Sequence, residues 1–535
     1  MIISVFLLLI SVGGVFISSD CFVETENGIK QYLISISASV AIAVLSLQKS
    51  PLGCLKRSLE HKIFAYGLIA ICLLLSTQGL LQYLGILQSN HMCFRITGSF
   101  ENPAGFAAIQ SLLFIVPLYC SFKNRINLYV RIVASSVAIL AFVVVVLSGS
   151  RCGVLAMLSA VFFTSYYETD FKNQIKRHRW ILFLLLLILL AFIVFLYKLK
   201  TDSANGRLFI WSICLNMIAD SPLFGFGSNG FLTKYMEYQA EYFAENRLSP
   251  YSLLADNINH PFNEYLDLVV KYGLFGLAIA VYLLYLLVKT ILKESKAKKT
   301  LGISVVSTVM IMSSFSYPFN YSAFVFILIV LLIYVLPVAE PVPNRKYLWF
   351  KRMTAVLSVF MAMHFVFDCY YNMKWAAMYK RSQKGDTERM LPHYKQMKSR
   401  LWYNPYFLYN YSAELNLIGR YEESNSIAGE CVKMMNDYDV QMLLADNHFK
   451  LSNYDEALIR YETAHNMCPN RFVPLYKQFK IYKAQGDTAM MISIGNEILS
   501  KKVKVPSRKI DIILNNVRYE MKIDEGVEAP PDGEG

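Results

Sequence analysis

The stretch WILFLLLLILLAFIVFLY, from Trp180 to Tyr197, contains no charged residue. It is long enough to cross the hydrocarbon core of a bilayer as a single helix. Basic residues precede it in the segment 172–179, and a longer, more polar segment, 198–261, follows it. Similar apolar runs recur from the N-terminus to about residue 370, so the sequence predicts an all-α bundle of membrane-spanning helices.

The composition of the whole chain indicates the same class. Of its 535 residues, 55% are hydrophobic and only 17% are charged, and the mean hydropathy is +0.37. Ordinary soluble domains are considerably more polar. We expect the first run to be a retained span and not a removable signal peptide, because no basic residue precedes it and no small-residue cleavage site follows it. The apolar runs predict about eleven spans, at approximately 2–17, 32–47, 63–87, 104–120, 132–147, 153–167, 180–197, 266–292, 303–316, 323–336 and 354–367.

Basic residues are distributed in a way that predicts the topology. Lysine and arginine clusters follow every second predicted span, and loops of this kind are cytoplasmic by the positive-inside rule. The N-terminus is then cytoplasmic, whereas the loop 198–261 and the C-terminal domain are external. The net charge of +13 is therefore a topology signal and does not predict nucleic-acid binding. The clusters lie at 49–62, 123–125, 172–179, 293–299 and 345–352.

The polar C-terminal part contains a repeat of 33 residues, which aligns Phe407, Val440 and Val473. Its clearest copy has small and aromatic residues where two antiparallel helices pack in a tetratricopeptide repeat. Such a solenoid either binds a protein partner on its concave surface or caps the membrane domain. The predicted domains are a transmembrane domain, 1–371, a tetratricopeptide-like domain, 372–523, and a disordered end, 524–535.

Neither a metal nor a cofactor is predicted. The ten cysteines show no Cys-x-x-Cys or Cys/His spacing, although Cys431 and Cys468 are candidates for a disulfide in an oxidising space. The run from Gly225 to Gly230 fits the dinucleotide pattern G-x-G-x-x-G, but it follows a predicted helix where that motif requires a strand. The pair Asp437 and Asp439 falls at a repeat boundary. Both motifs are expected to be turns.

The stretch HPFNEYLDLVVKYGLFGL, residues 260–277, opens a predicted span with polar residues. Because Pro261 is favoured in the first turn of a helix, we expect the helix to begin there, with His260 near its N-cap. His260, Glu264, Asp267 and Lys271 would then share one helix face. Polar residues inside a span typically mark a functional site. The alternative is that they only anchor the helix at the membrane surface.

Three arginines are predicted at the same membrane depth as this stretch. Arg151 lies in a tight turn between two spans, and Arg95 and Asn102 precede the fourth span. Arg207 is expected to open an amphipathic helix along the membrane surface, with an apolar side formed by Leu208, Trp211, Leu215 and Ile218. Together, the guanidinium groups could bind a diphosphate without a metal. Each alone could instead anchor to lipid headgroups.

Four motifs in this order, RITGSFENPAG, SGSRCG, GRLFIW followed by DSPLFGFG, and HPFNEYLDLVVKYGLFGL, resemble the O-antigen ligase and O-antigen polymerase family. The resemblance covers roughly residues 95–277. It implies a C-type glycosyltransferase-like helical fold in the bacterial inner membrane, with the loop and the C-terminal domain in the periplasm. It also implies a glycan donor carried on undecaprenyl diphosphate. The implied acceptor is lipid A core, a growing glycan or a protein hydroxyl.

The resemblance also implies roles for individual residues in a metal-independent, inverting transfer. Arg151 and Arg207 would bind the diphosphate, and His260 would act as the acceptor-side base. The family has a His-Asn pair before its Gly-x-x-Gly; here Asn263, Gly273 and Gly276 match, but Phe262 stands at the histidine position. If His260 does not take that role, Glu264 or Asp267 is the next candidate. The predicted substrate-binding residues are Arg95, Asn102, Asn263, Glu264 and Asp267.

Several functions remain open at this level. A ligase or a protein O-oligosaccharyltransferase is favoured, and a repeat-unit polymerase of O-antigen or exopolysaccharide is the closest alternative. A polysaccharide transporter is disfavoured, because the polar residues cluster on the external face and not near the bilayer midplane. A non-catalytic assembly scaffold would tolerate loss of Arg151, Arg207 and His260.

Overall fold

The computed structural model describes residues 2–23, 27–48, 51–123, 126–178, 180–337 and 345–521. The regular secondary structure in these ranges is helical, and none of them contains a β-strand. The predicted disordered end, 524–535, and the basic residues Lys49, Arg125 and Arg179 lie outside the described residues.

The chain divides into two compact units, each of which is described by itself. The membrane unit comprises residues 1–198, 262–265 and 278–377. The loop-tail unit comprises residues 199–261, 266–277 and 378–535. The loop that the sequence assigns to the membrane part therefore packs with the C-terminal helices.

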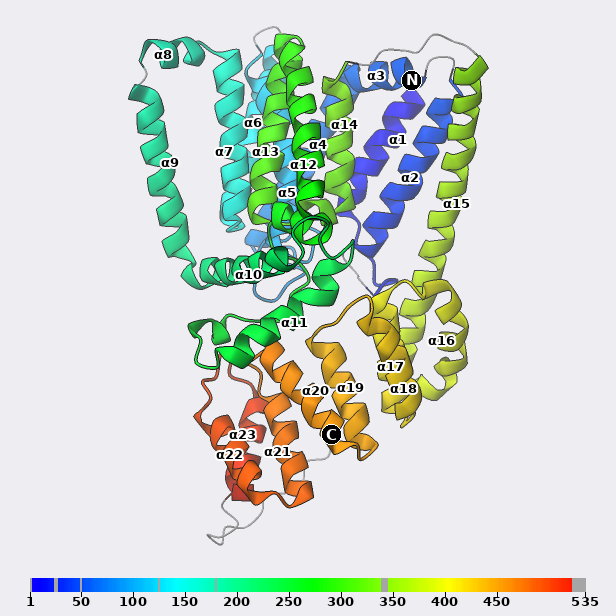
Figure 1. The fold of residues 1–535 in the computed structure, drawn as a ribbon. Coiled ribbons are helices and arrows are strands. Elements are labelled where there is room, and N and C mark those ends of the chain that lie inside the picture. Colours follow the sequence, from blue (N-terminus) through cyan, green and yellow to red (C-terminus); the bar gives the residue numbers. More distant parts are fainter. Residues whose placement is uncertain are drawn as a thin grey trace. The chain divides into compact units, whose positions relative to one another are not determined.

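The membrane unit is a bundle of long helices (Figure 1). Each of the eleven apolar runs falls on one of them. Among the described residues, six helical stretches are long and apolar enough to cross a membrane: 28–46, 62–83, 103–121, 128–147, 264–293 and 345–401. The count of eleven spans stays a prediction. The helices are α1 (Ile2–Gly13), α2 (Gly28–Ser46), α3 (Pro51–Glu60), α4 (Lys62–Tyr83), α5 (Pro103–Ser121), α6 (Leu128–Leu147), α7 (Arg151–Glu168), α8 (Phe171–Arg177), α9 (Trp180–Leu199), most of α12 (Glu264–Lys293), α13 (Lys296–Phe315), α14 (Ser322–Val335) and most of α15 (Arg345–Arg381).

Helix α5 forms the centre of this bundle and packs against α4, α6, α7, α13 and α14. Its most apolar window is 72% buried, against 33% for α6, as expected of a helix that is hydrophobic on all sides. Small residues allow close packing: a Cβ on Gly153 of α7 would lie 2.8 Å from Ala107 of α5. Hydroxyl pairs join α7 to α13, including Thr164 and Ser304 at 3.2 Å.

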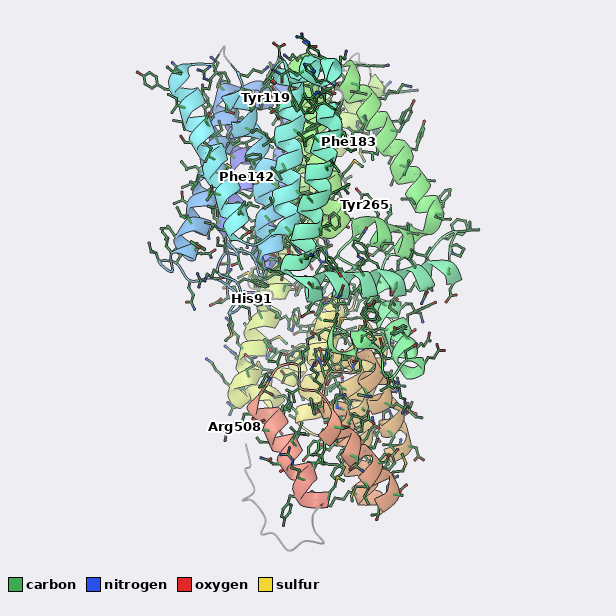
Figure 2. All side chains as sticks on the ribbon, turned by 90° about the vertical axis from the view of Figure 1, so that its left-hand side faces the viewer. His91, Tyr119, Phe142, Phe183, Tyr265 and Arg508 are labelled. Atoms are coloured by element: carbon green, nitrogen blue, oxygen red, sulfur yellow. The ribbon has the colours of Figure 1, made fainter. Side chains whose placement is uncertain are left out.

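The basic loops of the membrane unit meet at one end of the bundle. The Glu168 carboxylate lies 3.0 Å from the Lys123 ammonium and 3.7 Å from that of Lys296. Tyr119 lies at this end and His91 at the opposite end (Figure 2). Two basic segments separated along the chain, 123–125 and 293–299, thus share one side with Glu168, which shortly precedes a third, 172–179. The orientation in a membrane stays a prediction.

The loop-tail unit consists of two loop helices followed by consecutive helix pairs. Helix α17 begins at Pro405, α19 follows 33 residues later at Tyr438, and α21 begins at Val473. Small and aromatic residues such as Ala457 and Tyr461 are fully buried between them, where the repeat pattern placed them. The tetratricopeptide assignment itself stays a prediction. The helices are α10 (Thr201–Asp220), α11 (Gly230–Glu245), α16 (Thr387–Leu401), α17 (Pro405–Leu417), α18 (Tyr421–Val432), α19 (Tyr438–Lys450), α20 (Tyr454–Met467), α21 (Val473–Gln485), α22 (Thr488–Ser500) and α23 (Arg508–Met521).

The two tail cysteines considered for a disulfide are not paired with each other. Cys431 and Cys468 are both free and fully buried. Burial raises the pKa of the Cys431 thiol to about 12 and also raises that of Cys468. Both thiols are therefore protonated and unreactive near neutral pH.

Candidate active site

The start of α12 corrects the sequence prediction. The helix begins at Glu264 and not at Pro261, so His260 lies in the preceding loop and does not share a helix face with Glu264 and Asp267. Phe262 has a φ of 54°, a left-handed conformation that cannot continue a helix. The Asn263 side-chain oxygen accepts the Tyr265 N–H at 3.0 Å and caps the first turn.

Asn263→Ala should lower the stability of the folded protein by about 1 kcal/mol, because the first turn of α12 loses its cap. Asn263→Asp is the control, since aspartate caps helices as well as asparagine does. The thermal unfolding midpoint of the purified protein in detergent measures both. Equal midpoints for the alanine and aspartate variants would contradict the capping role.

Gly273 breaks α12 and allows an unusual backbone pairing inside the loop-tail unit. Its φ of 64° and ψ of −167° are accessible essentially only to glycine. The backbone of 222–227 pairs with that of 270–275 through four hydrogen bonds: Phe226 N–H to Val270 O, Gly227 N–H to Lys271 O, Leu274 N–H to Pro222 O and Phe275 N–H to Leu223 O. We call this pairing the clasp. The glycine-rich segment expected to be a turn does contain turns, and it also forms one side of the clasp.

At the His91 end of the membrane unit, the turn 317–321 brings several predicted residues together. The Asn102 amide donates to the Tyr317 hydroxyl at 2.7 Å, and its side-chain oxygen caps α5. The ring of Phe262 packs edge-on against Tyr317 at 5.5 Å. The Glu264 carboxylate accepts the Phe319 N–H at 3.0 Å. Asn102, Asn263 and Glu264 therefore all stabilise local structure at this end.

Two polar residues outside the predicted site, Gln82 and Lys30, hold the segment before α5. The Gln82 side chain accepts the Gly98 N–H and donates to the Gly98 carbonyl, both at 2.8 Å. The buried Lys30 ammonium donates to the Ser99 carbonyl at 2.6 Å and lies 4.8 Å from the Phe100 ring centre. Gln82 within one apolar run and Lys30 just before another are visible in the sequence and could have identified this contact.

The arginines of the membrane unit occupy different environments. Arg95 is exposed, with its guanidinium 6.0 Å from the centre of the Tyr83 ring. Arg151 is half-buried at the first position of α7, after the short turn that the sequence predicts. Since Gly153 packs against Ala107, Arg151 and Asn102 lie at the same end of the α5–α7 pair.

Arg207 lies within α10 and does not open it, because the helix begins six residues earlier at Thr201. Residues Leu208 and Leu215 are more than half exposed, as expected for a side that contacts a membrane surface. Trp211 lies one turn after Arg207, and its indole N–H donates to the Pro261 carbonyl at 3.0 Å. This bond connects α10 directly to the residue after His260, a role that periodicity alone did not predict.

His260 is partly buried near an ion pair of the same unit. The Lys271 ammonium lies 2.5 Å from the Asp267 carboxylate. Burial, with a further contribution from the positive charge of Lys271, lowers the pKa of His260 from 6.5 to about 4. The imidazole is therefore neutral at pH 7 and able to accept a proton. Arg207 lies on α10. His260 and Asp267 lie between the two segments that the clasp joins, 222–227 and 270–275.

The candidate residues thus form two groups: Arg95, Asn102, Arg151, Asn263 and Glu264 in the membrane unit, and Arg207, His260 and Asp267 in the loop-tail unit. Within the described ranges, no three His, Cys, Asp or Glu side chains are arranged to hold a metal ion. The chemistry available is that of guanidinium groups, a neutral imidazole and a carboxylate. Such groups bind anions and transfer protons.

Apolar helices and a loop that carries Arg207 and a neutral His260 fit an enzyme that works at a membrane. Residues 136–281 match the family profile described as O-Antigen ligase. The match indicates a membrane glycosyltransferase of the O-antigen ligase or polymerase type and supports the resemblance drawn from the motifs. No curated protein matches the chain significantly.

Proposed function

We propose that this protein transfers a glycan from undecaprenyl diphosphate to an acceptor hydroxyl at the periplasmic face of the bacterial inner membrane. The observation that carries the proposal is the family match, because residues 136–281 include Arg151, Arg207, His260 and both sides of the clasp. Lipid-linked glycan donors and glycan acceptors are the substrates that this family implies.

The proposed reaction is an inverting displacement. The acceptor oxygen forms a bond to the anomeric carbon of the glycan, and the bond from that carbon to the diphosphate oxygen breaks. The hydroxyl proton passes to His260, and undecaprenyl diphosphate leaves. Arg151 and Arg207 stabilise the negative charge that develops on the diphosphate. The diphosphate bond supplies the free energy, so no nucleotide is needed.

The low pKa of His260 determines when it can act as a base. A base works best when its pKa is close to the working pH, and a pKa of about 4 makes free His260 a weak base. A bound diphosphate would raise this pKa, because a nearby negative charge favours the imidazolium form. His260 would therefore become an effective base after the donor has bound.

A repeat-unit polymerase is the alternative. Deletion of the gene followed by analysis of surface glycans and glycoproteins separates the two. Fully polymerised glycan that remains unlinked indicates a ligase, whereas single repeat units on the acceptor indicate a polymerase. Normal glycans after complementation with His260→Ala or Arg207→Ala would overturn the catalytic proposal and favour a scaffold.

Transfer by the purified protein should continue at an undiminished rate in excess EDTA, because the proposed chemistry uses guanidinium groups in place of a metal ion. The measurement is turnover of a lipid-linked donor with and without the chelator. A loss of turnover that added Mg²⁺ or Mn²⁺ restores would contradict the metal-independent mechanism.

A further inference from the structure

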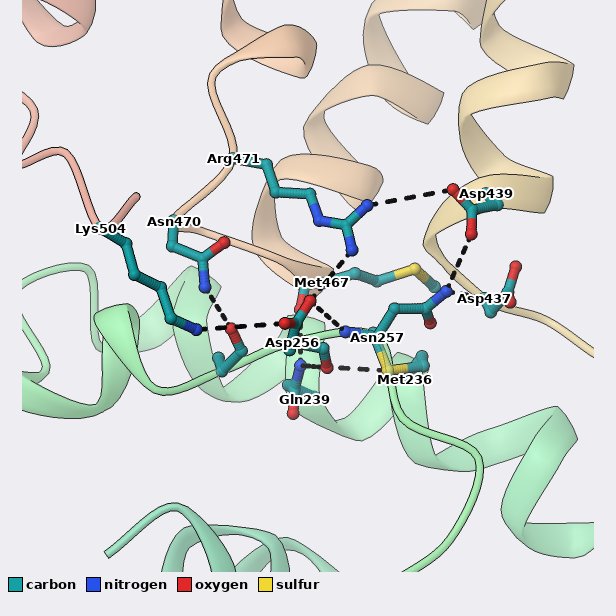
Figure 3. A network of polar contacts seen from close by, with 11 residues as sticks. Met236, Gln239, Asp256, Asn257, Asp437, Asp439, Met467, Asn470, Arg471 and Lys504 are labelled. Atoms are coloured by element: carbon teal, nitrogen blue, oxygen red, sulfur yellow. Dashed lines mark hydrogen bonds and ion pairs between the residues drawn. The ribbon is translucent and has the colours of Figure 1, made fainter. Parts of the chain in front are cut away.

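The segment 255–259 leads directly to the proposed catalytic His260, and the C-terminal helices hold its first three residues in place (Figure 3). The Asn470 amide donates to the Ala255 carbonyl. The Arg471 guanidinium donates to the Asp256 carboxylate at 3.0 Å. Since backbone and side chain are both bonded, this part of the loop is fixed in position and orientation.

Asn257 makes the next contact. Its side-chain amide donates to one carboxylate oxygen each of Asp437 and Asp439, both at 3.1 Å. Asp437 also caps α19 by accepting the Val440 N–H at 3.0 Å. The two aspartates therefore accept the hydrogen bonds of the Asn257 side-chain amide. Burial and the neighbouring Asp437 raise the pKa of Asp439, because both disfavour its charged form. The hydrogen bond from Asn257 stabilises that charged form.

Arg471 connects these contacts to one another. Its guanidinium lies 4.2 Å from the centre of the Tyr438 ring and 4.0 Å from the Asp439 carboxylate. Asp256 also lies 4.0 Å from the Lys504 ammonium. The negative charges of Asp256 and Asp439 are thus compensated by cations of the same network.

A larger apolar contact supports the polar one. Helix α11 packs against α20, with Phe231, Tyr235 and Met467 almost completely buried. The Gln239 amide donates to the Met467 carbonyl at 2.6 Å, and the Asn436 N–H donates to the Leu232 carbonyl at 3.0 Å. The tail therefore binds a segment of its own chain along an extended surface.

A cavity of about 530 Å³ lies beside this network, but its charged groups do not indicate a ligand. Asp256, Asp439, Arg471 and Lys504 all line it, and these are the groups that already pair with one another. A charged ligand would have to break those pairs. The network is therefore better suited to fixing the loop than to binding a small molecule.

We propose that the C-terminal helices act as a clamp that positions His260, and that Asn257 and Arg471 are its main positioning residues. This inference rests on the proposed transferase function. The clamp fixes Ala255, Asp256 and Asn257 before the histidine, and the Trp211 indole fixes Pro261 after it. Loss of the contacts to Ala255, Asp256 and Asn257 would let the imidazole of His260 leave its partly buried position. No residue that contacts the substrate would be changed.

The test compares Asn257→Ala and Arg471→Ala with a matched control in the full-length protein. Lys477→Ala removes the 2.6 Å ion pair with Asp446 elsewhere in the tail and leaves the clamp intact. We expect each clamp variant to lower kcat about 10- to 100-fold, because small displacements of a catalytic group have effects of that size. The control should keep its kcat. Arg471→Lys should recover part of the loss, since it retains the charge that faces Asp256.

A second readout does not depend on catalysis. The rate at which diethyl pyrocarbonate modifies His260, followed by mass spectrometry of its peptide, should rise several-fold in both clamp variants and stay unchanged in Lys477→Ala. Faster modification in a protein that transfers no glycan would uphold the clamp and reject the proposed function. An active protein whose clamp variants match the control in kcat and in modification rate would overturn the clamp.

Discussion

Arg207→Ala and His260→Ala should each reduce kcat for glycan transfer by about 100-fold or more. Removal of one group that stabilises developing charge typically costs about 100- to 1,000-fold in kcat, and removal of a general base costs a similar factor. Both variants should fold, since neither residue lies in the hydrophobic core. Matched controls are Arg247→Ala, which removes an exposed arginine of the same loop, and His393→Ala, which removes an exposed tail histidine. Activity near the wild-type level in Arg207→Ala and His260→Ala would reject the assigned roles.

The pH dependence of transfer gives an independent test of His260. Its pKa of about 4 in the free protein means that the neutral base is present above that pH. The acid limb of kcat/KM, which reports the free enzyme, should therefore fall near pH 4 and not near 6.5. The acid limb of kcat should lie at higher pH, because the bound diphosphate raises the pKa. Identical limbs for kcat and kcat/KM would contradict the proposed effect of the donor.

Lys271→Gln should move the kcat/KM limb toward higher pH, because removal of a nearby positive charge raises the pKa of an imidazole. The shift of the limb should be smaller than the difference between about 4 and 6.5, because burial lowers the pKa of His260 more than Lys271 does. The direction of the shift is the diagnostic result. A shift toward lower pH would mean that Lys271 does not act on His260 as a neighbouring charge.

The sequence predicted the helices of the membrane unit well but not the local geometry of the site. A run such as 180–197 can satisfy its backbone in lipid only as a helix, so composition and length were sufficient. The start of α12 depended on the left-handed conformation of Phe262, whose ring packs against Tyr317. No periodicity in 260–277 reports a contact with a residue more than fifty positions away.

The same limit applies to the loop-tail unit. The sequence predicted a turn at the aspartate pair, but Asp437 is the N-cap of α19 and Asp439 lies in its first turn. Neither they nor Asn257 stand out in the sequence, and only the fold brings their side chains to 3.1 Å. The glycine pattern at 225–230 was visible, and its local turns were predicted correctly. Its partner was not predictable, because backbone pairing leaves no pattern of side chains that distinguishes 222–227 from any other turn.

Gly273→Ala should prevent accumulation of folded protein. A Cβ at this position would lie 2.2 Å from the Leu223 carbonyl carbon and oxygen, so relief requires movement of the backbone and not of a flexible side chain. The glycine-only backbone conformation adds about 1–3 kcal/mol of strain. Opening of the clasp would also release its four hydrogen bonds, each contributing about 1 kcal/mol. The measurement is the yield of monodisperse protein after detergent extraction, followed by its thermal unfolding midpoint.

Three other glycines separate the causes of this effect. Gly225→Ala should be nearly as damaging, because its Cβ would lie 2.5 Å from the Val270 carbonyl oxygen on the opposite side of the clasp. Gly227 also has a positive φ, of 84°, but open space around it, so its alanine variant should lose only about 1–2 kcal/mol from backbone strain. Gly206 lies inside α10 with nothing within 4 Å, and Gly206→Ala should raise the unfolding midpoint, because alanine favours a helix by about 1 kcal/mol. If Gly273→Ala and Gly227→Ala were equally stable, backbone strain alone would explain both, and the close approach of the two clasp segments would not be needed.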